Sequence, residues 1–106
     1  GMNQAGMMKQ IQKMQEDMQN TQAEIENTEF TTSSGGGAVE VTVNGSHEVK
    51  SIHIKPEVVD PDDVEMLEDM LIAALNEAMR KASDTMEREM NKITGGMNIP
   101  GLGGLL

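Results

Sequence analysis

The two histidines, His47 and His53, are the residues of this chain best suited to metal binding or acid–base chemistry. Imidazole titrates near neutral pH and is the commonest protein ligand for transition metals. Both histidines fall in one predicted strand, and their separation of six positions corresponds to roughly 20 Å of extended chain. That separation is too large for two ligands of one ion. The sequence therefore predicts two solvent-exposed side chains and no metal site.

The densest group of carboxylates comprises Asp60, Asp62, Asp63 and Glu65. A calcium loop of the EF-hand type needs oxygen ligands at alternating positions and a glycine at its turn. Pro61 interrupts this pattern, and the glycine is missing. The same residues suit a helix start, where Asp caps backbone N–H groups and Pro occupies the first helical position. We interpret them as capping residues.

Phosphate-binding and nucleophilic motifs are also missing. Gly35-Gly36-Gly37 lacks the Lys-Ser/Thr ending of a phosphate loop. Ser33, Ser34 and Ser46 have no sequence signature of a nucleophile, and there is no cysteine. The sequence predicts a protein that is not an enzyme, without catalytic residue, cofactor, metal or small-molecule substrate.

The basic residues indicate a different chemistry, the binding of a polyanion. Six of them fall on two predicted helices: Lys9, Lys13, Arg80, Lys81, Arg88 and Lys92. If these helices pack antiparallel, residues 9–17 and 80–92 hold six basic and five acidic residues, a net charge of +1. The rest of the chain holds two basic and thirteen acidic residues, a net of −11. From these residues alone, a solvated coiled-coil face with ordinary ion pairs is the favoured explanation.

The longer helix is predicted from Asp60 to Thr94, with Asp60 as its N-cap and glycine at its C-terminal end. Its first half is apolar nearly all round, which predicts burial on several sides. Its second half keeps one apolar stripe, which suits a single partner helix. The stripe consists of Ala82, Met86, Met90 and Ile93.

The partner helix is predicted from Met7 to Thr28. Apolar and threonine side chains recur there at alternating spacings of four and three: Met7, Ile11, Met14, Met18, Thr21, Ile25 and Thr28. This is the seam of a heptad repeat. Because the seam is narrow, we expect this helix to pack on the longer one.

Three strands are predicted between the helices, at residues 29–34, 39–43 and 47–54. Asn44-Gly45 predicts a type I′ hairpin turn with both residues at positive φ. Val49 is separated from Ile52 and Ile54 by odd numbers of positions, so its parity in a regular strand would place it on the opposite face. A β-bulge, or a second apolar face against a partner, would explain this parity.

The chain is predicted to be one α+β domain over residues 1–94, followed by a flexible glycine-rich tail at 95–106. Gly1 before Met2 resembles an expression tag scar. The chain has no secretory signal pattern, and its longest apolar run, Met70 to Leu75, is too short to span a bilayer. We therefore expect no membrane association.

Four segments carry a family resemblance: Met8–Gln15 (MKQIQKMQ), Val39–Gly45 (VEVTVNG), Pro56–Asp69 (PEVVDPDDVEMLED) and Gly95–Gly101 (GGMNIPG). In this order, and with this order of elements, the chain resembles the YbaB/EbfC family of bacterial nucleoid-associated proteins. The resemblance implies a tweezer-like homodimer with projecting helical arms. It also implies sequence-tolerant binding of double-stranded DNA in the cytoplasmic nucleoid.

We accordingly predict that a homodimer grips DNA through phosphate contacts of the six cations, with little base readout. The first half of the longer helix is apolar over more surface than one three-stranded sheet can cover, which predicts that a second protomer buries the remainder. The predicted interface residues are Val49, Leu67, Leu71, Leu75 and Ala78. The alternative is a protein-interaction module whose Met-rich arms hold a partner helix.

Overall fold

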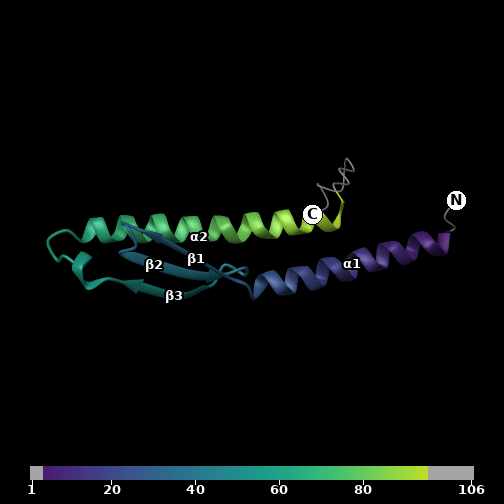
Figure 1. Cartoon of the computed structure of the whole chain (residues 1–106), viewed down its shortest axis with the longest axis horizontal. Helices are drawn as coiled ribbons and strands as arrows, with labels where there is room; N and C mark the ends of the chain where they lie inside the picture. The colour runs from purple at the N-terminus through teal and green to yellow at the C-terminus, as the bar shows by residue number, and fades with distance from the viewer. Residues whose placement is uncertain (1–3, 96–106) are drawn as a thin grey trace.

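The computed structural model describes residues 4–95. Its elements are α1 (Gln4–Glu26), β1 (Glu29–Ser34), β2 (Val39–Asn44), β3 (Val49–Ile54), the 3-10 turn η1 (Pro56–Val58) and α2 (Val64–Ile93). This is the predicted α+β order, and the molecule is elongated, 71 × 24 × 19 Å (Figure 1). The predicted tail, apart from Gly95, lies outside the described residues.

The three strands form one antiparallel sheet in the order β1-β2-β3. The inward residues of β2 and β3 pair as Val39–Ile54, Val41–Ile52 and Val43–Val49. A register shift after Thr42 leaves Lys50 as the extra residue of a β-bulge. The bulge returns Val49 to the face of Ile52 and Ile54, which is the first of the two explanations predicted for its parity.

Helix α2 packs on one face of the sheet, over β1 and β2. Ala74 and Ala78 have no exposed surface, and their small side chains let the helix approach the strands closely. Two hydroxyls of β1 donate hydrogen bonds to helix carbonyls: Thr32 Oγ1 to Ala74 O and Ser34 Oγ to Met70 O, both at 2.6 Å. These bonds hold β1 directly against α2.

The inward face of β3 lies beside α2 and is not covered by it. Val49 and Ile52 remain 46% and 47% exposed although they point to the same side as the buried valines of β2. We call these two residues the open face. On the first half of α2, Ile72 is 57% exposed. The predicted burial of α2 on several sides is therefore not met within one protomer.

Helix α2 begins at Val64, so the prediction of Asp60 as its N-cap is wrong. The N-cap is Asp63, whose carboxylate accepts a hydrogen bond from the backbone N–H of Met66 at 3.3 Å. The carbonyl of Asp60 accepts from the backbone N–H of Asp63 at 3.0 Å, which closes a turn with Pro61 at its second position. Proline suits this position of a turn as well as the first turn of a helix.

The turn between β2 and β3 also differs from the prediction. Its positive φ belongs to His47 (φ 65°), and neither Asn44 nor Gly45 has one. The backbone N–H of His47 donates to the carbonyl of Asn44 at 3.0 Å, so Gly45 and Ser46 occupy the centre of the turn. Glycine is still required at 45, because a Cβ there would collide with the backbone carbonyl of Ile25 at the end of α1.

Candidate nucleic-acid interface

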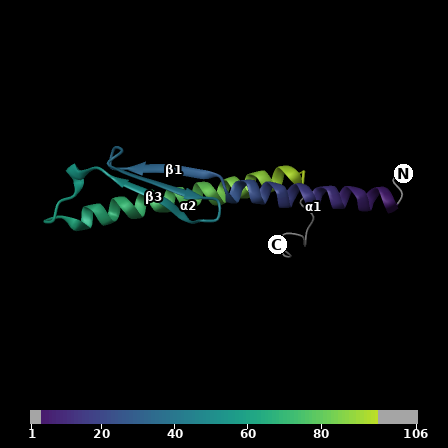
Figure 2. The ribbon, with the colours of Figure 1, turned by 90° about the horizontal axis from the view of Figure 1, so that it is seen from below.

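Helix α1 lies antiparallel to the second half of α2, and the two form an arm that projects from the sheet (Figures 1 and 2). We define the arm as residues 4–26 and 80–93. Ile25 is buried next to the sheet, whereas Met14 lines a hollow with Ile93 near the far end of α2. The predicted packing of α1 on the second half of α2 is therefore confirmed between Met14 and Ile25, whereas Met7 and Ile11 of the same stripe stay exposed.

Four of the six predicted cations line open hollows along the outer part of the arm. Arg88 and Lys92 line one hollow on α2, and Lys9 and Lys13 line a second on α1. Lys13 and Lys92 meet in a third hollow, between the two helices. Because neighbouring hollows share a lysine, the four cations form a row that crosses from one helix to the other.

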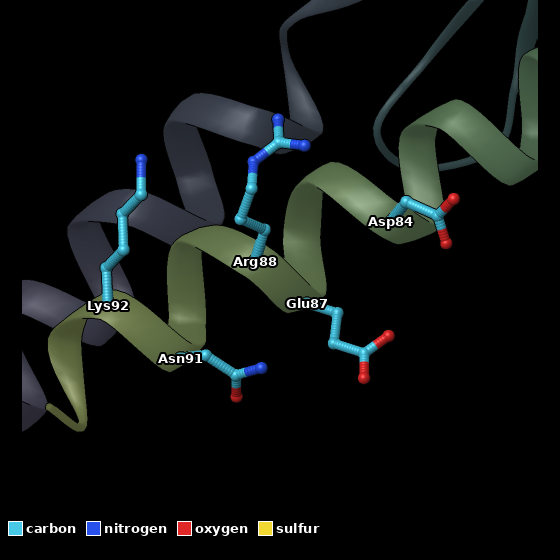
Figure 3. A pocket seen from close by; sticks show the side chains of 5 residues that line it. All are labelled: Asp84, Glu87, Arg88, Asn91 and Lys92. Carbon is cyan, nitrogen blue, oxygen red and sulfur yellow. The ribbon is translucent and has the colours of Figure 1, made fainter. Parts of the chain in front are cut away.

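The turn of the α2 helix separates charges of opposite sign. Arg88 and Lys92 are four residues apart, and Figure 3 shows their side chains projecting to the same side of α2. Glu87 and Asn91 project to the opposite side (Figure 3). Of the two carboxylates that line this hollow, that of Glu87 is therefore turned away from the two cations.

Positive charge is in excess where the two helices meet. Lys13 and Lys92 share that hollow with one acidic residue, Asp17, whereas each of the other two hollows has two basic and two acidic residues. Lys92 also forms an ion pair with Glu89 at 3.2 Å, with 65% of the lysine side chain exposed. Such a surface pair contributes about 0–1 kcal/mol. A phosphate can therefore attract Lys92 away from Glu89 at little energetic cost.

Arg80 and Lys81 line none of these three hollows. They precede Arg88 by eight and seven residues, which places them about 12 Å closer to the sheet along α2. Both are exposed at the base of the arm. Their contact with DNA stays a prediction.

The residues predicted for the dimer interface differ in their accessibility. Val49 is on the open face, and Leu67, Leu71 and Leu75 are half-buried along the edge of the core. Ala78 has no exposed surface because it packs on the sheet of its own protomer. A second protomer cannot reach the Ala78 side chain in this conformation.

His47 has a structural role that sequence reasoning missed. Its Nε2 forms a hydrogen bond with Ser83 Oγ at 2.8 Å, which links the β2–β3 turn to α2 where the arm leaves the sheet. The two residues are 36 positions apart, and the positive φ that directs the side chain toward α2 has no local sequence signal. His47 is exposed, as predicted, but its imidazole also forms a hydrogen bond that the sequence did not indicate.

Within residues 4–95, no group of three or more His, Cys, Asp or Glu side chains is arranged to hold a metal ion. Neither helix described there is apolar enough over a sufficient length to cross a membrane.

Comparisons with known proteins agree with the fold. A family model described as the YbaB/EbfC DNA-binding family matches residues 1–97. A nucleoid-associated protein of Alkaliphilus metalliredigens is 62% identical over 100 residues, covering 94% of this chain and 88% of that protein. One of Clostridium acetobutylicum is 57% identical over 102 residues, covering 96% and 91%. The crystal structure of an uncharacterized Helicobacter pylori protein has the same fold, with a TM-score of 0.66 at 23% identity over 83% of this chain and 92% of that one. This chain belongs to the YbaB/EbfC DNA-binding family.

Proposed function

We propose that this chain is a non-enzymatic DNA-binding protein of the bacterial nucleoid, in the cytoplasm, which grips duplex DNA as a homodimer. Its family and the names of its relatives support this class of function. The observation that carries the proposal is the meeting of Lys13 and Lys92 from two helices, flanked by Lys9 and Arg88. They bring four cations together on a chain whose net charge is −10.

The charge distribution determines how DNA can approach. Phosphate attraction supplies most of the affinity of a sequence-tolerant DNA-binding protein. Outside residues 9–17 and 80–92, two basic residues oppose thirteen acidic ones, so the sheet end repels DNA. Lysine acts as a mobile point charge toward phosphate and carries little sequence information. The single aromatic residue, Phe30, lies in β1, so the arm has no platform for base stacking.

The homodimer would cover the apolar surface that the protomer leaves exposed. Val49 and Ile52 form the open face, and Val64, Met66 and Ile72 are exposed on the first half of α2. A second copy can bury these residues in a symmetric interface. Two linked arms would then contact one duplex together, which raises the overall affinity without any new contact within either arm.

A salt titration of duplex-DNA binding tests the proposal. If about two to four cations per protomer meet phosphates, log affinity should fall with log salt concentration at a slope of about −4 to −7 for the dimer. Affinity should be modest, since Asp17 and other acids of the arm repel the same phosphates. Exchanging the DNA sequence should change affinity much less than the charge variants below.

The decisive variant combines Lys13→Glu and Lys92→Glu, and it should abolish binding while the protein stays folded, because both side chains are exposed. The matched control is Lys50→Glu with Lys55→Glu, which changes the net charge equally at exposed sites outside the arm. Loss of binding in both variants would show that total charge matters and the arm does not. A wild-type protein that binds no duplex at low salt would refute the DNA function.

One observation favours the alternative function, a module that holds a partner helix. Met7, Met8 and Ile11 on α1 are 52%, 60% and 53% exposed. Methionine suits adaptable binding surfaces. Arm-dependent capture of a helical peptide by a protein that fails to bind DNA would support this alternative.

A further inference from the structure

The turn between β2 and β3 lies at the end of the sheet from which the arm projects (Figure 1). Its conformation is fixed by the side chain of Asn44, a residue that is 7% exposed. The Oδ1 atom of Asn44 accepts hydrogen bonds from the backbone N–H groups of Ser46 and Glu48, both at 3.0 Å. Its Nδ2 donates to Glu48 Oε1, also at 3.0 Å. The turn is therefore held in one shape by hydrogen bonds of its own.

This turn contacts the end of α1 through Gly45. The backbone N–H of Gly45 donates to the carbonyl of Thr28 at 3.1 Å, just after α1 ends. Gly45 also lies so close to the carbonyl of Ile25 that a Cβ would collide with it. Ile25 is itself buried. The turn thus meets the base of α1 at two points that are three residues apart in the chain.

The same turn contacts α2 through His47, whose Nε2 forms the hydrogen bond of 2.8 Å with Ser83 Oγ. The φ of His47, 65°, is the only positive one among the residues other than glycine in the range 4–95. Such a backbone conformation is uncommon for a side chain with a Cβ, and it persists where surrounding contacts require it. Because Gly45 and His47 are two positions apart, one turn connects both helices of the arm at their base. We call residues 44–48 the joint.

The joint acts on the cations through the length of the two helices. Lys13 lies twelve residues from Ile25, which is about 18 Å of helix. Lys92 lies nine residues from Ser83, which is about 14 Å. A rotation of α1 by about 10° at its base would therefore move Lys13 by about 3 Å. Ile11, further out on α1, is 53% exposed, so packing at the outer end contributes little to the orientation of the helix.

We propose that the joint sets the angle between α1 and α2 through the hydrogen bond of His47 with Ser83, and thereby holds Lys13 beside Lys92. His47 is a positioning residue for the basic pair, since it acts through the two helices and lines none of the three hollows of the arm. The effect on DNA binding rests on the proposed function, whereas the effect on the geometry of the arm does not.

Distances between two spin labels test this geometry. The chain has no cysteine, so Gln12→Cys and Asn91→Cys provide one exposed label site on each helix of the arm. Diluting labelled chains with unlabelled chains restricts each measured distance to one protomer. Double electron–electron resonance should give one narrow distribution for the protein with His47 intact. His47→Asn should widen or shift it by several Å, because Asn tolerates positive φ but is too short to reach Ser83.

Three further variants separate positioning from stability. Ser83→Ala removes the other partner and should give the same distribution as His47→Asn, with nothing added when the two are combined. His53→Asn makes the same replacement at the exposed histidine of β3 and should leave the distribution narrow. Thr32→Val removes a hydrogen bond of the core and should lower stability without widening the distribution. An unchanged distribution in His47→Asn would refute the proposal, and so would equal widening in Thr32→Val or His53→Asn.

Binding to duplex DNA tests the consequence in unlabelled protein. His47→Asn should weaken binding by about threefold to tenfold at an unchanged slope of log affinity against log salt concentration, because the same cations still meet phosphates once the arm is aligned. An unchanged affinity would refute the effect on binding. A wild-type protein that binds no duplex would refute the proposed function alone, since the label distances would still decide whether the joint orients the arm.

Discussion

At the scale of single residues, the hollow between the two helices of the arm is lined by a small excess of positive charge. Lys13 and Lys92 come from different helices and face one carboxylate, that of Asp17, in the hollow between them. Each side chain is exposed, so each charge acts through solvent and is screened by salt. Substituting one residue can therefore change the local net charge by a large fraction without changing the fold.

Asp17→Asn tests this balance, and it should strengthen duplex-DNA binding. Removing one negative charge beside two lysines lowers the repulsion of phosphate, and we expect a gain of about twofold to fivefold that declines as salt rises. The matched control is Glu24→Gln, an equal change of charge on the same helix but nearer the sheet. Equal gains in both variants, measured by the same titration, would contradict a local role for Asp17.

Gly45 and Gly36 provide a second test at this scale, because glycine is needed for different reasons at the two positions. A Cβ at 45 meets the backbone of Ile25, whereas a Cβ at 36 meets nothing but would sit at φ +68°. Gly45→Ala should lower the free energy of unfolding by about 2–4 kcal/mol, because backbone must move. Gly36→Ala should lower it by about 1–2 kcal/mol.

Urea denaturation at one protein concentration measures both values. A cost for Gly36→Ala that equals or exceeds that of Gly45→Ala would mean that the end of α1 does not pack against the β2–β3 turn.

At the scale of elements, the contact between β1 and α2 joins the sheet to the helix that carries half of the arm. Small side chains on α2 let the strand approach, and two hydroxyls of β1 bond to carbonyls one helical turn apart, at Met70 and Ala74. Hydroxyls at alternate positions of a strand point to the same face. Their spacing thus matches one turn of the helix.

Thr32→Val removes the buried hydroxyl of this contact while it keeps the shape and β-branching of the side chain. We expect a loss of about 1 kcal/mol in the free energy of unfolding, the usual contribution of one hydrogen bond. The control is Thr31→Val on the exposed face, where the hydroxyl bonds only to that of Thr42. Thermal melts that rank Thr31→Val as the more damaging substitution would contradict this account of the docking.

At the scale of the whole molecule, the protomer has an acidic sheet end and a nearly neutral arm. Residues 9–17 and 80–92 have a net charge of +1, and the remainder has −11. The sheet end also carries the open face, Val49 and Ile52, which α2 leaves uncovered. Association through that end would leave the arm accessible to DNA, since the arm and the sheet lie at opposite ends of the long axis (Figure 1).

Ile52→Asp tests the dimer more cleanly than a charge at Leu71 or Leu75, because the two leucines also contribute to the core of the protomer. A charge on the open face should raise the dissociation constant of the dimer about a hundredfold or more. Ser51→Asp adds the same charge on the opposite face of β3 and should have a much smaller effect. Sedimentation that finds the wild type monomeric at micromolar concentration would refute the dimer.

The sequence by itself determined the order of elements, the packing of α1 on the second half of α2 and the location of the basic residues. β1 has the predicted bounds, Glu29–Ser34, and the alternating valines of β2 are buried as predicted. These features follow from periodicity, because a spacing of two or of three and four assigns each side chain to one face of a strand or helix.

Only the tertiary structure decided where α2 begins, why residue 45 is glycine and what His47 contacts. Pro61 is compatible with a turn and with a helix start, so local preference alone could not choose between them. The partners of Gly45 and His47 are Ile25 and Ser83, which are distant in sequence. Likewise, the heptad spacing places Met7 and Ile11 on the apolar face of α1, but it could not show that α2 ends before it reaches them. Periodicity records which face of an element is apolar, but the element that covers that face is set by contacts between residues far apart in the chain.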